Sequence, residues 1–420
     1  MALELTEGDR SLLAGEGGEA AALAMRIVTR LAAAQGAGRL IDITSAHIDS
    51  CLYHGDAGLD FAERLAGAGG GVVVPTTLNV SSLDLLHPGL FRGSAELAAK
   101  GRRLMDAYVA MGGTPTWTCA PYQLMHRPAL GEHVAWAESN AIVFANSVLG
   151  ARTDRYGDFI DICAALTGRV PESGLHRDEA RRGRVVFRVE GLPERLLDAA
   201  VLYPVLGHLV GKRTGTLVPV IDGLPRSPGE DALKALGAAS ASSGGVAMFH
   251  AVGITPEAPT LADALGGGEP DRTVTVDLDL VLAARDELTT SSDGPLSAVS
   301  MGTPHASLAE LRRLAGLFDG RDASVATYVN TGRDVLALAE EEGVARRLTG
   351  AGVAIVTDTC TYITPIMAAH DGVVMTDSGK MAYYAPGNLG LDVAFGSMED
   401  CVESAVAGSI TRDEAVWHGN

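Results

Sequence analysis

Three of the five cysteines lie in polar segments: Cys119 in TWTCAPY, Cys360 in TDTCTYITP and Cys401 in GSMEDCVES. None of the five belongs to a C-x-x-C pair, the spacing typical of structural zinc sites. Widely separated single thiolates suit a metal centre that folding assembles, with one coordination position left open. Three converging thiolates favour an iron–sulfur cluster, of the 2Fe–2S type or larger, or iron. A structural zinc site, with four ligands in a closed geometry, is the alternative.

Other polar side chains capable of binding or acid–base chemistry follow the predicted strands. Each of them alone is more typical of a turn or a cap. Their repetition favours a shared site, because ligands of parallel α/β sheets gather at the carboxyl ends of the strands. The set comprises His47, Asp49, Thr76, Thr77, Asn79, Cys119, Tyr122, His250, Thr303, His305, Asp358, Cys360, Ser378 and Lys380. Cys163, within the apolar run FIDICAALTG, is more typical of a core thiol.

The elements that would position these residues alternate between buried strands and helices. RLIDITSAHID, GGVVVPTTLN and VAIVTDTC predict strands with polar ends, while 95–111, 131–150, 232–244 and 398–408 predict helices. This pattern predicts an α/β protein of several lobes, with parallel or mixed sheets flanked by helices and the active site at strand ends between lobes. We expect N-terminal lobes over 1–255, a boundary segment at 256–293 and a C-terminal lobe over 294–420.

The composition narrows the classes of partner. A net charge of −19 argues against nucleic acid and anionic membrane surfaces, which need clusters of Lys and Arg. The N-terminus lacks the basic and apolar segments of a signal peptide, and no apolar run reaches the ~20 residues of a membrane span. We therefore expect a cytoplasmic protein with reduced thiols. The sequence contains no dinucleotide-binding G-x-G-x-x-G after a strand, Walker A, G-x-S-x-G or H-E-x-x-H motif.

Several ordered blocks resemble the aconitase X family over residues 5–410. They include SAHIDSCLYHGDAGL, VPTTLN, CAPY, GEHVAWAESNAIVFANSVLGARTDR, FHAVGITPEA, GTPHASLAEL, DTCTYITP and DSGKMAYYAPGNLG. The resemblance is to the large, catalytic portion of the family. It implies an aconitase-like fold with an iron–sulfur site, and a separate small subunit that carries the swivelling domain, hence a heterodimer.

The family resemblance implies a hydro-lyase acting on a small hydroxy acid. One family activity dehydrates cis-3-hydroxy-L-proline to Δ1-pyrroline-2-carboxylate, and the other dehydrates mevalonate 5-phosphate. The phosphomevalonate type carries a cysteine ligand where this chain has Thr303, whose hydroxyl cannot replace a soft thiolate. IDSCLYHG and YAPGNLG are more similar to the hydroxyproline type, which we therefore favour. A non-catalytic, metal-sensing or RNA-binding relative is an alternative of another class.

The resemblance also assigns roles to residues. Cys119 and Cys360 carry over as metal ligands, and Cys401 or Cys51 would be the third. Cys51 has a second interpretation, as a thiol that exchanges protons with the substrate.

Dehydration further requires a base, a proton donor and a clamp for the carboxylate. Ser378 is the predicted base, because aconitases use a serine, and His47 or His305 would protonate the departing hydroxyl. The remaining residues bind substrate: Lys380 or Arg152 at its carboxylate, and Asp49, Ser50, Thr77 and Asn79 around it. An ion pair with Asp154 or Glu138 is the alternative for Arg152.

Overall fold

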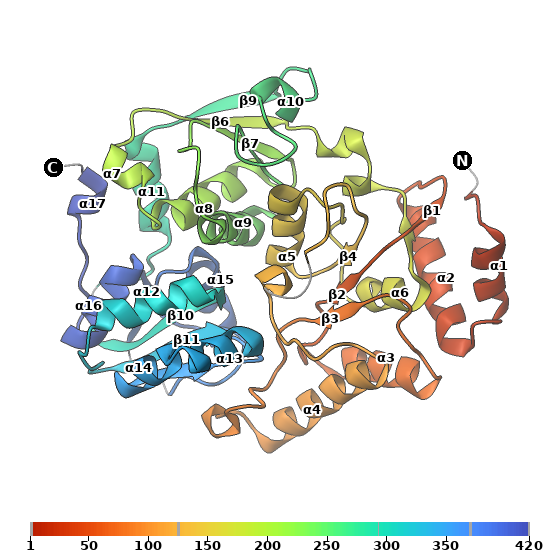
Figure 1. Cartoon of the computed structure of the whole chain (residues 1–420), viewed down its shortest axis with the longest axis horizontal. Helices are drawn as coiled ribbons and strands as arrows, with labels where there is room; N and C mark the ends of the chain where they lie inside the picture. Colours follow the sequence, from red (N-terminus) through yellow and green to blue (C-terminus); the bar gives the residue numbers. More distant parts are fainter. Residues whose placement is uncertain (1–2, 124–126, 293, 369–371, 419–420) are drawn as a thin grey trace. The chain divides into compact units, whose positions relative to one another are not determined.

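The computed structural model describes residues 3–123, 127–292, 294–368 and 372–418. The chain forms two compact units (Figure 1). Unit 1 comprises Met1–Leu83 and Gly93–Arg181, and unit 2 comprises Asp84–Arg92 and Arg182–Asn420.

Unit 1 contains a parallel sheet of order β3–β2–β4 and an antiparallel pair of β1 and β5. Its strands are β1 (Leu40–Asp42), β2 (Ala46–Ile48), β3 (Thr76–Leu78), β4 (Ala135–Trp136) and β5 (Arg169–Pro171). Its helices are α1 (Glu7–Ala14), α2 (Glu19–Ala34), α3 (Asp56–Gly67), α4 (Ala95–Ala110), α5 (Ser139–Phe144) and α6 (Ile160–Thr167).

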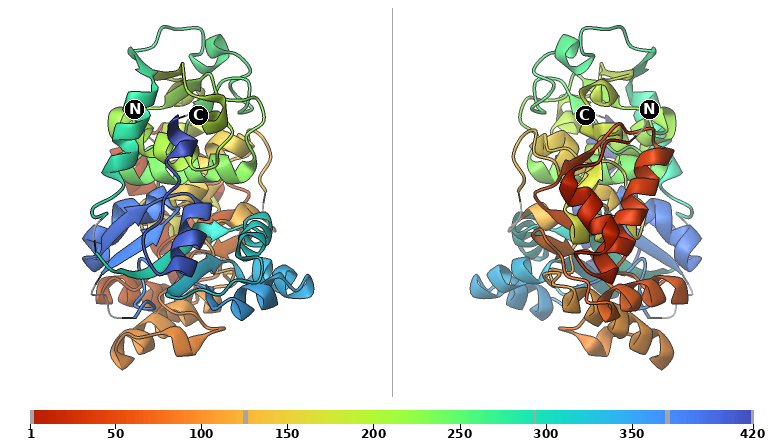
Figure 2. Two further views of the ribbon diagram at one scale, coloured as in Figure 1. Left: turned by 90° about the vertical axis from the view of Figure 1, so that its left-hand side faces the viewer. Right: turned by 90° about the vertical axis from the view of Figure 1, so that its right-hand side faces the viewer.

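The helices of unit 1 pack in pairs, α1 on α2, α2 on α6 and α3 on α4 (Figures 1 and 2). Helix α1 begins at a capping box, in which Thr6 and Asp9 each accept a hydrogen bond from the other's backbone N–H. Gly15 ends α1 in a left-handed conformation, so residues 7–34 form two helices, α1 and α2, and not one continuous helix.

The first part of unit 2 is built on a four-stranded parallel sheet of order β8–β7–β6–β9. The strands are β6 (Val185–Val189), β7 (Pro219–Asp222), β8 (His250–Ala251) and β9 (Arg272–Val276). The helices are α7 (Glu194–Leu197), α8 (Leu202–Thr214), α9 (Glu230–Gly244), α10 (Leu261–Ala264) and α11 (Leu278–Glu287).

Helices α8 and α9 lie close together because glycines meet at their contact. A Cβ at Gly207 would lie 2.3 Å from the carbonyl oxygen of Leu236, and one at Gly244 would lie 1.9 Å from that of Gly211. No side chain fits at these positions without moving backbone, so the glycines set the separation of the two helices.

The second part of unit 2 is built on a five-stranded parallel sheet of order β12–β11–β10–β13–β14. The strands are β10 (Leu296–Ala306), β11 (Ala326–Thr331), β12 (Val353–Val356), β13 (Val373–Thr376) and β14 (Asp392–Phe395). The helices are α12 (Leu308–Phe318), α13 (Arg333–Glu341), α14 (Val344–Gly350), α15 (Gly379–Leu389), α16 (Met398–Ala407) and α17 (Ala415–His418).

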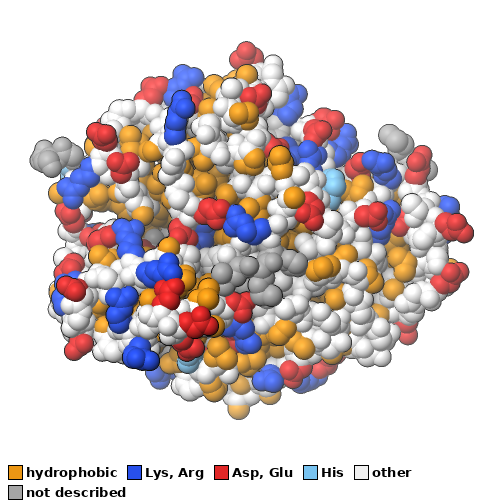
Figure 3. All heavy atoms as spheres, viewed as in Figure 1, with side chains coloured by type: hydrophobic (Ala, Val, Ile, Leu, Met, Phe, Trp, Pro, Cys, Tyr) orange, Lys and Arg blue, Asp and Glu red, His pale blue; other side chains and the backbone are white. Residues whose placement is uncertain are grey.

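The core of this second part comes from one face of each flanking helix. In α12, the side chains of Leu311, Leu314 and Phe318 are buried at helical spacing and pack against strand residues such as Val299 and Val329. The polar faces lie outside, and acidic and basic side chains are interspersed on the face shown in Figure 3.

The α/β class with parallel sheets flanked by helices, predicted from the sequence, is confirmed. Two segments differ from their predictions. RLIDITSAHID, predicted as one strand, forms β1 and β2, which belong to different sheets. The segment 131–150 contains strand β4 before α5, and a π-helical turn at Ala145–Leu149 follows. Residues 256–293, the predicted boundary segment, include strand β9 and helices α10 and α11. In the described part of the chain, no helix combines the length and apolar character that crossing a membrane requires.

Candidate active site

His305 is the next-to-last residue of strand β10 and is fully buried. Its Nε2 is 3.0 Å from the carbonyl oxygen of Thr359. A carbonyl can only accept, so Nε2 carries the proton and the ring's lone pair lies on Nδ1. A second hydrogen bond of this kind is what orients a metal-binding imidazole in proteins. His305 therefore has the tautomer of a ligand that binds through Nδ1.

Cys360 lies in the loop after β12, and side chains from elsewhere in unit 2 hold this loop rigidly. Asp84 accepts hydrogen bonds from the N–H and hydroxyl of Thr357, at 2.8 and 2.9 Å. Asp358 has a left-handed backbone, with φ of 61°, and its carboxylate is bound by Arg333 at 2.9 and 2.7 Å. A non-glycine residue keeps such a conformation only where its surroundings enforce it, as they commonly do at functional sites.

The Cys360 sulfur and a ring nitrogen of His305 lie within 4.8 Å of each other, so both can reach one ion. Both side chains are buried, and a thiolate with an imidazole suits iron, zinc or an iron–sulfur cluster. The residues present thus fit part of a metal site in unit 2. His305 was predicted as a proton donor; the structure adds the interpretation that it is a ligand.

The other two predicted cysteine ligands lie in different surroundings. Cys119 lies in a loop of unit 1 and is buried. Its own carbonyl oxygen accepts a hydrogen bond from Asn140 Nδ2 at 3.0 Å. Cys401 is in helix α16, within the apolar core of the five-stranded sheet. Burial there and nearby Asp377 raise the pKa of the Cys401 thiol well above its usual value, which disfavours the thiolate. Cys401 is not a member of the group formed by His305 and Cys360.

Asn330, at the end of β11, connects the Cys360 loop to Thr303 on β10. Its Oδ1 accepts from the N–H of Thr361 at 3.0 Å. Its Nδ2 donates to the Met301 carbonyl at 2.8 Å and lies 3.5 Å from the Thr303 hydroxyl. The backbone comes this close because residue 302 is glycine, with φ of 77°, and a Cβ there would lie 2.3 Å from the Asn330 carbonyl oxygen.

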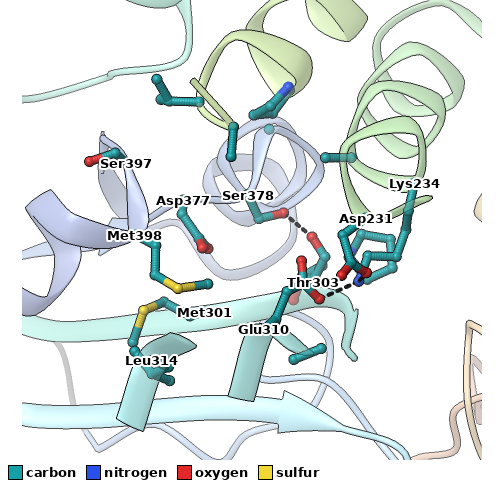
Figure 4. A pocket seen from close by; sticks show the side chains of 18 of the residues that line it. Asp231, Lys234, Met301, Thr303, Glu310, Leu314, Asp377, Ser378, Ser397 and Met398 are labelled. Carbon is teal, nitrogen blue, oxygen red and sulfur yellow. Dashed lines mark hydrogen bonds and ion pairs between the residues drawn. The ribbon is translucent and has the colours of Figure 1, made fainter. Parts of the chain in front are cut away.

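A cavity of about 210 Å³ lies in unit 2 at the carboxyl ends of β10, β13 and β14 (Figure 4). Its polar lining comes from Asp231 and Lys234 of α9, Thr303 of β10, Glu310 and Arg313 of α12, the segment Asp377–Lys380, and Ser397 and Glu399 at α16. Carboxyl ends of parallel strands are the usual place for ligands in such folds. The cavity adjoins the metal-site strand directly, because Lys234 Nζ lies 3.3 Å from the His305 carbonyl oxygen.

Five charged residues of this cavity form ion pairs with one another, and one carboxyl in it does not. Lys234 is 2% exposed and forms ion pairs with Glu310 and with Asp231, the latter at 3.0 Å. Burial alone would lower the pKa of Lys234, but these two carboxylates outweigh it and keep the ammonium charged. Arg313 pairs with Glu399 at 2.5 Å.

The exception is Asp377, at the end of β13. In the part of the chain that the structure describes, no cation forms an ion pair with its carboxyl, which interacts with its own backbone N–H. Burial first, and Glu310 second, raise the pKa of Asp377 to about 7. Figure 4 shows the Asp377 carboxyl pointing into the space between Met398 and Glu310.

Ser378, the predicted base, caps helix α15. Its Oγ accepts from the N–H of Met381 at 3.0 Å and donates to the Thr303 carbonyl. Lys380 is 5% exposed, lines the same cavity and belongs to the first turn of α15. The structure thus brings Ser378 and Lys380 together in one cavity, with the hydroxyl proton of Ser378 committed to a backbone carbonyl.

In unit 1, four of the predicted residues meet at the ends of β2 and β3. His47 Nδ1 lies 2.8 Å from the Thr77 hydroxyl, and Asn79 Nδ2 donates to the Asp49 carboxylate. Asn79 Oδ1 is buried without a hydrogen-bond partner among the described residues. A buried amide oxygen without a donor is costly, so it is a natural acceptor for a ligand N–H or O–H.

Asp161 of helix α6 organises the loop that carries Asp49 and Ser50. It accepts from the Asp49 N–H at 2.7 Å and from the Ser50 N–H and hydroxyl at 3.3 Å. The Ser50 hydroxyl also lies 2.7 Å from the Tyr108 hydroxyl. Burial is the main cause that raises the pKa of Asp161 to about 6.

Arg152 does not join this group of strand-end residues. Its guanidinium donates to the His176 carbonyl at 3.1 Å and forms an ion pair with Asp178. The ion-pair partner is therefore Asp178, in place of Asp154 or Glu138 as considered from the sequence. Glu138 instead caps α5 by accepting from the Ala141 N–H at 2.7 Å.

Sequence reasoning missed four of these residues, although most of them left a signal. Asp161 and Lys234 are charged residues inside otherwise apolar helical stretches, a placement that predicts a buried partner. Asp377 directly precedes Ser378 at the end of a strand. The strand-end position that placed Ser378 in the candidate site therefore applies equally to Asp377. Asn330 gave no comparable signal.

Three family models match successive parts of the chain: the aconitase X first domain at residues 2–179, the second domain at 183–286 and the third domain at 296–407. The crystal structure of Thermococcus kodakaraensis aconitase X in its holo-form superposes with a TM-score of 0.86 at 34% identity. That match covers 96% of this chain and all of the other.

Named relatives are dehydratases, and therefore lyases. Cis-3-hydroxy-L-proline dehydratase of Pseudomonas aeruginosa is 48% identical over 97% of this chain and 71% of its own length. The enzyme of that name from Hypocrea jecorina is 44% identical over 97% of this chain and 69% of its own length. The phosphomevalonate dehydratase large subunit of Methanothermobacter thermautotrophicus is 38% identical over 91% and 93%. The sequence blocks, the observed fold and these matches agree, and the chain belongs to the aconitase X family.

Proposed function

We propose that this chain dehydrates cis-3-hydroxy-L-proline to Δ1-pyrroline-2-carboxylate. The observation that carries the proposal is the graded similarity to relatives, 48% and 44% for the two cis-3-hydroxy-L-proline dehydratases against 33–38% for five phosphomevalonate dehydratase large subunits. Thr303 supports the same substrate, because the resemblance gives the phosphomevalonate type a cysteine there.

The substrate's stereochemistry defines what the site must supply. In a cis-3-hydroxy acid the hydroxyl and the carboxylate lie on one face of the ring, so the C2 proton lies on the other. The base that removes this proton and the group that assists the hydroxyl therefore act on opposite faces. One residue cannot perform both tasks, and the site needs two separate groups.

The metal site serves the hydroxyl side in this proposal. His305 and Cys360 hold the metal or iron–sulfur cluster, and Cys119 of unit 1 is the third ligand, as the family resemblance implies. When bound, such a centre supplies a Lewis acid for the hydroxyl. We leave Cys401 out of the ligand set, because its apolar surroundings disfavour a thiolate.

The remaining predicted residues bind and orient the substrate. The cavity at α15 receives the ring, with the Lys380 ammonium beside the carboxylate. His47 is the proton donor to the leaving oxygen, because the Nε2 proton of His305 is directed to Thr359. Asp49, Ser50, Thr77 and Asn79 contribute polar contacts. Arg152 is not assigned to the carboxylate, because it pairs with Asp178.

The test is an assay of the metal-loaded protein. We expect a second polypeptide, the family's small subunit, to be required, and co-expression with it supplies the complete enzyme. Conversion of cis-3-hydroxy-L-proline to the pyrroline, with trans-3-hydroxy-L-proline untouched, would support the proposal. Turnover of mevalonate 5-phosphate alone would assign the chain to the other activity of its relatives.

A further inference from the structure

The base predicted from the sequence is already engaged in the structure. Ser378 Oγ accepts the Met381 N–H and donates its own proton to the Thr303 carbonyl. To act as a base, Ser378 would first have to give up its hydroxyl proton. The Thr303 carbonyl that accepts this hydrogen bond is neutral and cannot take the proton. The bond from Met381 caps helix α15 and the bond to Thr303 ties this turn to β10, so Ser378 holds the strand-to-helix turn in place.

The neighbouring residue has the properties that the base requires. Asp377 lies at the carboxyl end of β13, lines the cavity and points into it (Figure 4). Its carboxyl has no ion-pair partner within the described residues, whereas the other acids of the cavity are held by Lys234 or Arg313. It is thus the acid in this cavity that can change protonation without breaking an ion pair.

We propose that Asp377, rather than Ser378, accepts the C2 proton of the bound hydroxy amino acid. This inference rests on the proposed function. In the step, the C2–H bond breaks and its proton goes to the Asp377 carboxylate. The electron pair forms the C2–C3 double bond while the C3–O bond breaks, and the hydroxide takes a proton from a donor on the opposite face to leave as water. The resulting enamine becomes Δ1-pyrroline-2-carboxylate when its nitrogen loses a proton and C3 gains one. Asp377 gains one proton and the donor loses one, so both are restored through solvent.

The surroundings of Asp377 tune it for this task. A base is most effective when its pKa lies near the working pH, and burial raises the pKa of Asp377 to about 7. The charged groups that face it are Glu310 and Arg313 of α12, Asp231 and Lys234 of α9, Lys380 of α15 and Glu399 of α16, with the neutral thiol of Cys401 behind it. Lys234 and Arg313 favour the carboxylate, and Glu310 opposes it.

The substitution Asp377→Asn tests the assignment on the complete, metal-loaded enzyme. Asn has the shape of the neutral acid, so we expect an unchanged fold, unchanged metal content and a KM within about threefold. We expect kcat to fall by about 10²–10⁴-fold, the usual contribution of a general base. The acid limb of the pH profile of kcat/KM should vanish, and Asp377→Glu should recover part of kcat with a displaced limb.

Two further variants complete the design. Asp279→Asn, an exposed aspartate in the first turn of α11, is the matched control and should leave turnover as it is. Ser378→Ala should lower the melting temperature through loss of a helix cap and keep the acid limb of the pH profile. Wild-type enzyme that leaves cis-3-hydroxy-L-proline unchanged would refute the proposed function. Active wild type with an equally active Asp377→Asn variant, or loss of the acid limb only in Ser378→Ala, would refute the role of Asp377 alone.

Discussion

The strand ends of unit 1 and the cavity of unit 2 both bury carboxyl groups, but they treat them differently. In unit 1, Asp161 accepts hydrogen bonds from two backbone N–H groups at 2.7 Å, those of Asp49 and Ile162. In unit 2, Asp377 has no comparable set of donors and faces a cavity. Burial is the largest cause that raises both pKa values, to about 6 for Asp161, where three backbone N–H groups oppose the shift, and to about 7 for Asp377, where Glu310 adds to it.

This difference separates positioning from reactivity. A carboxylate that already accepts several hydrogen bonds holds a loop in place and gains little by taking a proton. A carboxyl with few donors and an open side can exchange its proton with a ligand. On this comparison Asp161 positions a loop of unit 1, whereas Asp377 is the carboxyl proposed to exchange a proton in the cavity of unit 2.

The largest effect is expected at the metal site that adjoins the cavity. Cys360→Ser replaces a soft thiolate by a hydroxyl, and loss of the Lewis acid, worth about 4 kcal/mol, corresponds to roughly a 10³-fold lower kcat. Metal analysis and visible absorbance of anaerobically purified protein should fall in parallel with activity. Cys163→Ser, in the apolar part of α6, is the control that should retain metal. Full activity of Cys360→Ser would disprove the metal-centred mechanism.

The buried ion pairs of the cavity should contribute strongly to the stability of the folded protein. Lys234→Met leaves Glu310 and Asp231 buried without their cation, and we expect about 3 kcal/mol of destabilisation, measured by thermal or urea unfolding. The matched control is Lys212→Met, which removes an exposed ion pair with Glu287 and should cost less than about 1 kcal/mol. Equal effects of the two substitutions would contradict the picture of a desolvated, paired cluster.

The carboxyl of Asp377, which has no ion-pair partner among the described residues, should make the free energy of unfolding depend on pH. The pKa of Asp377 is higher in the folded protein, about 7, than in the unfolded chain, near 3.8. The carboxyl is therefore protonated in both states below about pH 4, and its ionisation opposes folding increasingly up to pH 7. The full shift corresponds to about 4 kcal/mol, and we expect about half of that because the cavity admits water.

Asp377→Asn isolates this term. Its melting temperature relative to wild type should rise as the pH increases from 4 to 7 and then level off. A constant difference across this range would show that Asp377 is ionised in the folded protein at all these pH values.

The smallest effect is expected at the positioning carboxylate of unit 1. Asp161→Asn replaces one acceptor oxygen by a donor that faces the N–H groups of the 49–50 loop. Loss of one charge-assisted hydrogen bond, about 1.4 kcal/mol, would raise KM about tenfold with kcat little changed. Asp158→Asn, an exposed neighbour, is the control. A collapse of kcat with constant KM would show that Asp161 takes part in proton transfer and does not only position the loop.

Much of the fold could be predicted because its signals are local. The periodicity of buried strands and amphipathic helices appears within short windows, and β2, β3, α4, α9 and α16 were predicted from it. The segment 131–150 was assigned wholly to a helix because two strand residues inside an apolar stretch carry no pattern of their own.

The candidate site was predicted in its residue types, and less well in their roles. Polar residues at strand ends, such as His305, Cys360 and Ser378, could be selected from order and spacing alone. The sequence by itself thus determined the family, the α/β architecture and a set of chemically able residues.

Tertiary structure decided what each of these residues can do. The carbonyl that places the lone pair of His305 on Nδ1, the apolar core around Cys401 and the two bonds that engage Ser378 all come from distant segments. So does the environment of Asp377. Proton affinity depends on burial and on partners that the fold brings together, and neither quantity is encoded in the neighbouring residues of the chain.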